Sequence, residues 1–171
     1  ASETCAFDII GAKYVRDVEN GEIVIITKNG IESIKPFLKL KERPCIFERI
    51  YFARPDSIMD GKTVYTYRKN LGKQLAIENK IKADVVVPVL DSGVSAGLGF
   101  SQKSGIPLEL GIIRSHYVGR TFIEPTQSIR QLGVKLKHSV NKSCIENKRV
   151  VLIDDSIVRG TTAKKIVKMI F

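Results

Sequence analysis

The feature that most constrains this chain is an apolar run, Ala83–Leu90 (ADVVVPVL). A strand exposed on one face alternates apolar and polar residues, whereas a continuous apolar run is typical of a strand buried on both faces. Such strands occur in parallel sheets that are covered by helices on each side. The run therefore predicts an α/β fold built around a parallel sheet.

The segments around this run have the order expected of such a fold. Tyr67–Lys80 and Val94–Lys103 have helical patterns, while Leu108–Ile113 and Arg149–Ile153 are short apolar strands. Strands that alternate with helices favour a parallel sheet flanked by helices. Ligands bind such sheets beyond the carboxyl ends of the strands.

The amino-terminal part has a different pattern. Two apolar stretches within residues 22–35 flank Asn29-Gly30, which is a strong signal for a hairpin turn. Residues 22–35 are therefore predicted to form two antiparallel strands. The basic, proline-bounded segment Pro36–Pro44 is predicted to be a linker.

Polar loops follow two of the predicted buried strands, at residues 91–93 and 154–162. In the second loop, Asp154 and Asp155 leave the strand, and Gly160 precedes hydroxyl side chains at a helix start. Free N–H groups and the helix dipole favour a phosphate there, and glycine permits close backbone approach. The two carboxylates would repel a phosphate, so they are expected a few ångströms away, facing sugar hydroxyls or a divalent metal.

A helix cap, a receiver domain and a nucleotide-binding loop each fit this segment less well. Asp or Ser caps many helices, but a cap alone does not need the whole loop. Response-regulator receiver domains also have an acidic pair after a strand, but they would begin near this strand and do not need the Arg159–Thr162 anion cradle. The chain has no G-x-x-x-x-G-K-[ST] motif, and Gly97-Leu98-Gly99 lacks the third glycine of a dinucleotide fingerprint. That glycine pair is expected to ease helix packing.

Charge and composition narrow the class of ligand. The net charge is +10, which suits either nucleic acid or a phosphorylated metabolite. Tryptophan is absent, aromatic residues are only 7%, and no zinc-finger or RNP-like motif occurs. A small phosphorylated substrate is therefore expected, with no nucleic-acid or membrane partner. The three widely spaced cysteines suit reduced thiols in the cytoplasm.

Four segments together resemble one family, the amidophosphoribosyltransferases. The Asp154–Thr162 loop (DDSIVRGTT) resembles the phosphoribosyl pyrophosphate (PRPP) signature of type I phosphoribosyltransferases, and Ile50–Ser57 (IYFARPDS) and Tyr117–Ile123 (YVGRTFI) narrow the match. Ala1–Val18 resembles the end of that family's glutamine-hydrolysing domain. The resemblance implies an internal fragment, with residues 1–40 ending an N-terminal-nucleophile glutaminase domain and residues 41–171 beginning a phosphoribosyltransferase domain.

The resemblance also implies a role for individual residues. Asp154 and Asp155 would hold the ribose hydroxyls and Mg²⁺, with Ser92 as a third metal-site residue. Asp91, Ser92 and Gly93 would form the pyrophosphate loop. Arg120 and Thr121 would act from a flexible catalytic loop, and Tyr117 and Ile123 would line an ammonia channel. The 5′-phosphate would be bound by a run of seven residues: Ser156, Ile157, Val158, Arg159, Gly160, Thr161 and Thr162.

The implied activity transfers ammonia from glutamine to PRPP, releasing pyrophosphate, as the first step of purine biosynthesis. The full-length protein would be a homo-oligomer. This chain is expected to hydrolyse no glutamine, because the family's nucleophile is an amino-terminal cysteine in a part of the protein that this chain is expected to lack. Cys5 lies in the matching late-domain segment and is expected to be a buried small apolar residue. Cys45 matches the region of one ligand to a [4Fe-4S] cluster, but cluster-free relatives can also carry cysteine there, and both interpretations stay open. A salvage phosphoribosyltransferase and a non-catalytic PRPP-binding regulator are the alternatives.

Two positions depart from the family pattern. Leu90 stands where proline is expected, and Ser115 stands where asparagine is expected. Leu90 would relax the pyrophosphate loop, and Ser115 would weaken a contact near the closing loop.

Overall fold

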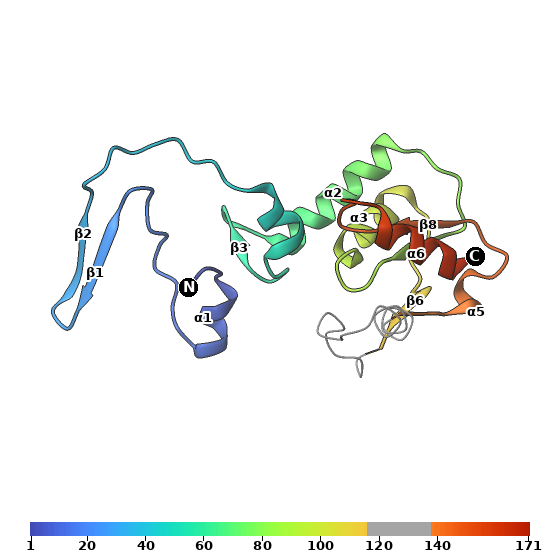
Figure 1. Ribbon diagram of the computed structural model, residues 1–171, viewed down its shortest axis with the longest axis horizontal. Coiled ribbons are helices and arrows are strands. Elements are labelled where there is room, and N and C mark those ends of the chain that lie inside the picture. The colour runs from blue at the N-terminus through green and yellow to red at the C-terminus, as the bar shows by residue number, and fades with distance from the viewer. Residues whose placement is uncertain (116–137) are drawn as a thin grey trace.

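The computed structural model describes residues 1–115 and 138–171. An α/β unit lies at one end, and a β-hairpin lies at the other (Figure 1). In chain order the elements are α1 (Cys5–Ile10), β1 (Ile23–Thr27), β2 (Gly30–Ile34), the π-helix η1 (Glu48–Phe52), β3 (Ile58–Met59), β4 (Lys62–Thr63), α2 (Val64–Glu78), β5 (Val85–Pro88), α3 (Val94–Ser104), β6 (Ile112–Arg114), β7 (His138–Val140), α5 (Lys142–Ile145), β8 (Val150–Ile153) and α6 (Thr161–Ile170).

The centre of the α/β unit is the parallel pair β5–β8, in register from Val85↔Val150 to Pro88↔Ile153. A parallel bridge also joins Val86 to Leu108. All four residues of β5 are buried. The predicted parallel sheet is therefore confirmed, with a strand that is buried on both faces.

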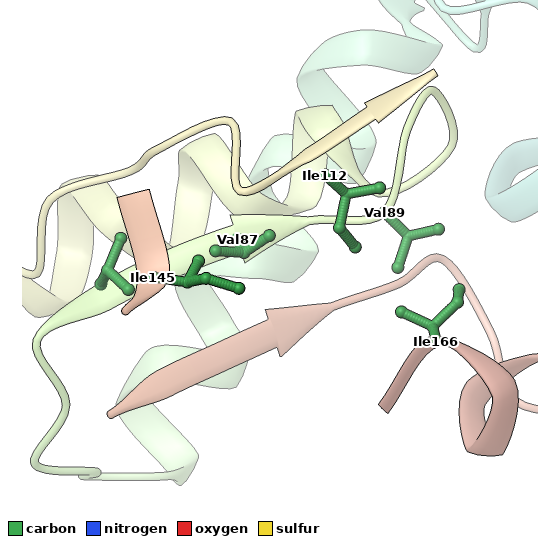
Figure 2. Close-up of a cluster of buried hydrophobic side chains, with 6 residues drawn as sticks. Val87, Val89, Ile112, Ile145 and Ile166 are labelled. Carbon is green, nitrogen blue, oxygen red and sulfur yellow. The ribbon is translucent and has the colours of Figure 1, made fainter. Parts of the chain in front are cut away.

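The apolar side chains of β5 alternate between two cores, because successive strand residues point to opposite faces. One face meets α5, α6 and β6 (Figure 2), and the other meets α2 and α3. The first core consists of Val85, Val87, Val89, Ile112, Ile145 and Ile166. The second core consists of Ala76, Val86, Phe100 and Ile153. This two-sided cover explains why the run has no polar alternation.

Helices α2 and α3 pack closely through small residues. A Cβ atom on Gly72 would lie 1.9 Å from the carbonyl oxygen of Ala96, and one on Gly99 would lie 1.9 Å from that of Lys69. Only glycine leaves room for the facing backbones at these two points. The expectation that Gly97-Leu98-Gly99 eases helix packing is confirmed for Gly99, whereas Gly97 faces Pro88 of β5 and Leu108.

Several predicted boundaries differ from those of the structure. Segment Leu108–Ile113 is not one strand: Leu108 forms the bridge to β5, and β6 begins only at Ile112, pairing antiparallel with β7. Gly111 lies between them, where a Cβ atom would be 2.6 Å from Ile145 Cγ2. Helix α2 begins three residues earlier than predicted, at Val64, because the Thr63 hydroxyl accepts a hydrogen bond from the Thr66 amide and caps it.

The amino-terminal region contains the predicted hairpin. Strands β1 and β2 pair antiparallel from Ile23↔Ile34 to Thr27↔Gly30, so Lys28-Asn29 forms the turn. Both strands are largely exposed. Residues 36–44 have no helix or strand, as expected for a linker.

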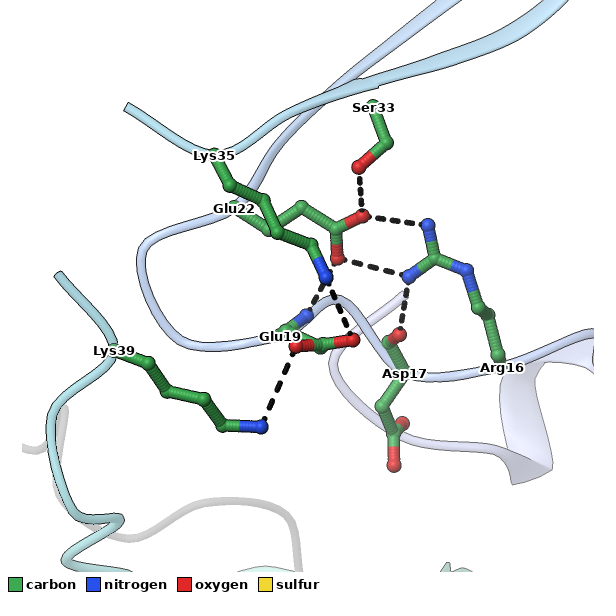
Figure 3. Close-up of polar contacts among 7 residues, drawn as sticks. All are labelled: Arg16, Asp17, Glu19, Glu22, Ser33, Lys35 and Lys39. Carbon is green, nitrogen blue, oxygen red and sulfur yellow. Dashed lines mark hydrogen bonds and ion pairs between the residues drawn. The ribbon is translucent and has the colours of Figure 1, made fainter. Parts of the chain in front are cut away.

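Polar contacts rather than a core hold this region together (Figure 3). The Arg16 guanidinium donates to Glu22 at 2.6 and 2.8 Å, and the Ser33 hydroxyl also donates to that carboxylate. Glu19 pairs with Lys35 at 3.0 Å and with Lys39 at 3.4 Å. These bonds join the segment before β1, the end of β2 and the linker that follows β2.

Candidate functional site

The loops that follow β5 and β8 are joined by hydrogen bonds. The amide of Val89 donates to the carbonyl of Ile153 at 2.8 Å, and the amide of Gly93 donates to the carbonyl of Val89 at 2.8 Å. The Ser92 hydroxyl donates to Asp154 Oδ1 at 3.3 Å. A Cβ atom on Gly93 would lie 2.3 Å from the Ile153 carbonyl oxygen, so a side chain there would push the loops apart. The structure thus brings together the two polar loops identified in the sequence.

The acidic pair is held by short local bonds. Asp154 Oδ1 accepts from the Asp155 amide at 2.9 Å, and Asp155 Oδ1 accepts from the Ser156 hydroxyl at 2.9 Å. Asp155 Oδ2 is buried and accepts no hydrogen bond from the described residues. A buried carboxylate oxygen without a partner is costly, so its position suits a ligand hydroxyl or a cation.

Oxygen atoms are the ligands that Mg²⁺ prefers, and the protein supplies one or two carboxylates in many such sites. Asp154, Asp155 and the adjacent Ser92 hydroxyl fit that chemistry. Among the described residues, no group of three or more His, Cys, Asp or Glu side chains is arranged to hold a metal. A donor set of two carboxylates and one hydroxyl leaves positions around an Mg²⁺ ion for substrate oxygens and water.

The loop after the acidic pair leads into helix α6. Gly160 has φ of 68°, a left-handed conformation that favours glycine, and α6 begins at the next residue. Ile157 and Val158 are exposed. The backbones of Thr161 and Thr162 form the first turn, and their side chains are outside the described set. The positive end of the helix dipole and the free amides of this turn therefore face the loop.

These elements surround a cavity of about 1150 Å³. An ion pair between Arg114, at the end of β6, and Asp91, in the first loop, lies on its wall. Arg114 was not among the site residues predicted from the sequence, although a basic residue at the carboxyl end of a strand was an available signal. The cavity is lined by Phe47, Tyr51, Phe52, Val89, Leu90, Asp91, Ser92, Arg114, Asp154, Asp155, Ser156, Ile157, Val158, Arg159, Gly160, Ala163 and Ile166.

A second cavity, of about 320 Å³, shares Ser92, Asp154 and Asp155 with the first. Arg68, on α2, lines it and was likewise not predicted from the sequence. The stripe that contains it is visible only in the structure, where the buried residues of α2 recur every four positions and Arg68 is one of them. The buried positions are Val64, Arg68, Gly72 and Ala76.

Some predicted site residues lie outside the described part of the chain. They are the two catalytic-loop residues and the two channel residues: Arg120, Thr121, Tyr117 and Ile123. The two departures from the family pattern are within it. Leu90 lines the larger cavity, and Ser115 follows β6 directly.

The cysteines differ in their surroundings. Cys5 is 4% exposed, as expected of a small buried residue, and receives a contact from the Ser57 hydroxyl at 3.1 Å. Glu3 accepts from that hydroxyl at 2.6 Å and from the Arg54 amide at 2.7 Å, and these hydrogen bonds hold the pKa of its carboxyl below the ordinary value. Cys45 is an exposed free thiol. The Glu3–Cys5 segment is therefore anchored to the loop before β3, whereas Cys45 faces solvent.

Comparison with curated proteins gives extensive matches. The chain is 64% identical to the amidophosphoribosyltransferase of Rhizobium etli and 52% identical to that of Bacillus subtilis, over 99% of the chain in both cases. It is 54% identical to a chloroplastic amidophosphoribosyltransferase of Arabidopsis thaliana. The chain spans 35% and 36% of the first two relatives, or about a third of their length. No family model matches.

Solved structures agree with the sequence matches. One is described as the allosteric regulatory enzyme of purine biosynthesis, and another as the B. subtilis glutamine PRPP amidotransferase in complex with ADP and GMP. Each superposes with a TM-score of 0.90 at 52% identity, over 99% of this chain. This chain covers 36% and 37% of those chains, respectively. No helix in the described part of the chain has the length and apolar character needed to cross a membrane.

Proposed function

This chain belongs to the amidophosphoribosyltransferase family, and we propose that the whole protein transfers ammonia from glutamine to PRPP. The products are 5-phosphoribosylamine, pyrophosphate and glutamate. The observation that carries the proposal is the junction of the two loops at the ends of β5 and β8, which puts Ser92 in hydrogen-bond contact with Asp154. That junction combines an acidic pair and a helix amino terminus beside one cavity.

The acidic pair would hold the sugar and the metal. Asp154 and Asp155 would accept hydrogen bonds from the ribose hydroxyls, and with Ser92 they would bind Mg²⁺ directly or through water. The unpartnered Asp155 Oδ2 supports this role, because a hydroxyl or cation would satisfy it. When bound, Mg²⁺ would neutralise negative charge on the leaving pyrophosphate.

The two loops would bind the two phosphate ends of the substrate. Residues 156–162 would hold the 5′-phosphate through backbone amides at the start of α6 and the Thr161 and Thr162 hydroxyls. The Asp91–Gly93 loop would hold the pyrophosphate. Arg114 lies on the same cavity wall, so its guanidinium would add positive charge next to that group.

The remaining assignments follow from family membership. Arg120 and Thr121 would contribute to catalysis from the segment between β6 and β7, and Tyr117 and Ile123 would line an ammonia channel. Substitution occurs at the anomeric carbon, where pyrophosphate leaves and ammonia attacks. Excluding water from the site would prevent hydrolysis from competing with ammonia.

Family membership also implies assignments for the rest of the protein. Residues 1–40 would belong to the glutaminase domain and residues 41–171 to the transferase domain, with the glutaminase nucleophile elsewhere in the whole protein. Cys45 would be one ligand of a [4Fe-4S] cluster if the whole protein carries one. We also propose a homo-oligomer in the cytoplasm, where free cysteines such as these three stay reduced.

The test is a variant of the whole protein with Asp154→Asn and Asp155→Asn. Hydrogen bonds to charged groups contribute roughly 1.5–3 kcal/mol each, so losing two should lower ammonia-dependent phosphoribosylamine formation by about 10²–10⁴-fold. Asp84→Asn is the matched control, because Asp84 is a carboxylate at the opposite end of β5 that pairs with Arg149 on the surface. A double variant within about fivefold of wild type would contradict the proposal.

A further inference from the structure

Arg68 is a buried arginine outside the loops that form the substrate site. It lies on α2 and is 7% exposed. Burying a guanidinium is costly unless its donors are satisfied, and in a helix that packs on α3 an apolar residue would be the simpler occupant. A buried charge in this position therefore calls for a specific role.

The donors of Arg68 hold one segment of backbone. Its Nε atom donates to the carbonyl of Arg49 at 2.8 Å, and its Nη2 atom donates to the carbonyl of Ala53 at 2.9 Å. These carbonyls lie inside η1 and directly after it. The planar guanidinium reaches both at once, which the single ammonium group of lysine does less well. Arg68 therefore fixes η1 relative to α2.

The segment held in this way forms part of the walls of both cavities. Ile50 lines the smaller cavity with Arg68, and three aromatic residues line the larger one. The aromatic residues are Phe47, Tyr51 and Phe52. Their position relative to the acidic pair depends on η1, because all three belong to it or directly precede it.

The charge of Arg68 acts on Asp155, one member of the acidic pair. Arg68 lines the smaller cavity together with Asp154 and Asp155. Burial lowers the pKa of its guanidinium, and the negative charges of Asp155 and Glu3 oppose that shift. Its hydrogen bonds to Arg49 and Ala53 go to carbonyl groups, which carry no formal charge. Its positive charge therefore remains to offset the carboxylates next to which a polyanionic substrate must bind.

We propose that Arg68 is a positioning residue for PRPP, which holds η1 against the site and offsets the negative charge of the Asp154–Asp155 pair. The inference rests on the proposed function. Arg68 belongs to neither the phosphate loop nor the pyrophosphate loop. Its hydrogen bonds go instead to backbone carbonyls in η1 and directly after it. Without the positive charge, the acidic pair repels PRPP more strongly, and binding then depends more on Mg²⁺ as the compensating cation.

The experiment compares four forms of the whole protein: wild type, Arg68→Gln, Arg68→Lys and Arg149→Gln. Glutamine removes the charge and keeps a donor, while lysine keeps the charge and loses the two-point donor. Arg149 is the matched control, because it is an exposed arginine at the opposite end of β8, paired with Asp84. Calorimetry measures PRPP binding at several Mg²⁺ concentrations, ammonia-dependent kinetics measure KM and kcat, and the melting temperature reports folding.

For Arg68→Gln we expect the Kd and KM for PRPP to rise about tenfold at low Mg²⁺, with kcat changed by less than about threefold. The deficit should shrink as Mg²⁺ is raised. Arg68→Lys should recover the part of the affinity that depends on charge and keep a smaller deficit of about two- to threefold, equal at every Mg²⁺ concentration, because it loses the two-point hold on η1. Arg149→Gln should bind as wild type does. If Arg68 acted only by holding the structure, its loss would lower the affinity for PRPP equally at every Mg²⁺ concentration. A loss of affinity that depends on Mg²⁺ therefore indicates that the charge matters.

A folded Arg68→Gln protein that binds PRPP like wild type would overturn the inference. So would a deficit that neither Mg²⁺ nor lysine relieves. If Arg68→Gln does not fold, the role of the charge is tested with Arg68→Lys alone. A folded lysine variant that binds PRPP tenfold more weakly than wild type, or worse, then refutes that role. Failure of wild type to bind PRPP in the presence of Mg²⁺ would instead refute the proposed function.

Discussion

Strands β5 and β1 consist of the same kind of residue but lie in opposite surroundings. In β5, Val85, Val86 and Val87 are at most 1% exposed, whereas Ile26 in β1 is 77% exposed. Branched side chains favour an extended backbone in both places. Burial is a separate matter, because it requires other elements to cover the strand. Helices cover β5 on both faces, whereas the described residues provide no such cover for β1.

This contrast explains why the candidate site is at one end of the molecule. The loops after β5 and β8 begin at strand ends that the core fixes, so Ser92 and Asp154 meet although 62 residues separate them. Within the part of the chain that the structure describes, the hairpin has no such core and relies on ion pairs such as Arg16–Glu22. Catalytic groups need fixed geometry, and rigid buried strands supply it better than an exposed hairpin does.

The largest expected effect comes from removing a core side chain in the α/β unit. Phe100→Ala removes a fully buried ring of α3 and should lower the free energy of unfolding by about 3–5 kcal/mol. Phe37→Ala is the matched control, since Phe37 is 67% exposed, and it should change stability by less than about 0.5 kcal/mol. Urea denaturation followed by hydrogen exchange at β5 measures both. Similar costs for the two variants would break the contrast between the regions.

An intermediate effect is expected where α2 meets α3. Gly72→Ala places a Cβ atom against the Ala96 carbonyl, and overpacking of this kind costs about 1–3 kcal/mol. Gly11→Ala is the comparison in the amino-terminal region, where a Cβ atom meets nothing within 4 Å but φ is +66°, so a smaller cost of about 1 kcal/mol is expected. Hydrogen exchange should show weaker protection at β5 for Gly72→Ala alone. Loss of β5 protection in Gly11→Ala would mean that the two regions are coupled.

The smallest effect is a dependence of the hairpin on pH. The Arg16 guanidinium, followed by the Ser33 hydroxyl, lowers the pKa of the Glu22 carboxyl to about 2, from an ordinary value of 4.5. Because the folded pKa is the lower one, the ionised carboxylate stabilises the hairpin above pH 4.5, and this contribution is lost as the pH falls towards 2. The protection factors of the β1 amides, which are corrected for the intrinsic pH dependence of exchange, should therefore fall over that interval.

The variant Glu22→Gln provides the control for the pH experiment. Its hairpin should show a flatter response between pH 4.5 and pH 2, while exchange at β5 keeps the wild-type response. An NMR titration of Glu22 measures its pKa directly. A midpoint near 4.5 would show that the contacts in Figure 3 do not persist in solution.

Local patterns predicted much of the fold. The Ala83–Leu90 run predicted a buried strand, and Asn29-Gly30 predicted the hairpin, because both signals depend on residues within a few positions of one another. The strand predicted at Leu108–Ile113 was wrong in extent. The break lies between Leu108 and Ile112, where Gly111 packs against Ile145 and Val87, and neither contact is visible in the local pattern.

In the candidate site, too, local signals were found from the sequence and long-range contacts were not. The Asp154–Thr162 loop was found from its residues, because the acidic pair, the glycine and the hydroxyls are adjacent in the chain. Arg68 and Arg114 were missed, since their relevance comes from elements far away in sequence: η1 for Arg68, and the loop after β5 for Arg114. The roles of Arg120 and Tyr117 stay predictions, because both residues lie outside the described part of the chain.

The sequence by itself determined the buried strand, the hairpin and the main helices of the α/β unit, where the acidic pair leaves its strand, and which family the chain resembles. Backbone sterics, side-chain alternation and motif spacing act over short distances along the chain, so they can be read directly. Only the tertiary structure decided that β8 pairs with β5, that Gly93 lies against the Ile153 carbonyl, and that Arg68 points toward η1. These outcomes depend on close packing between distant segments, where one added Cβ atom decides whether two backbones can meet.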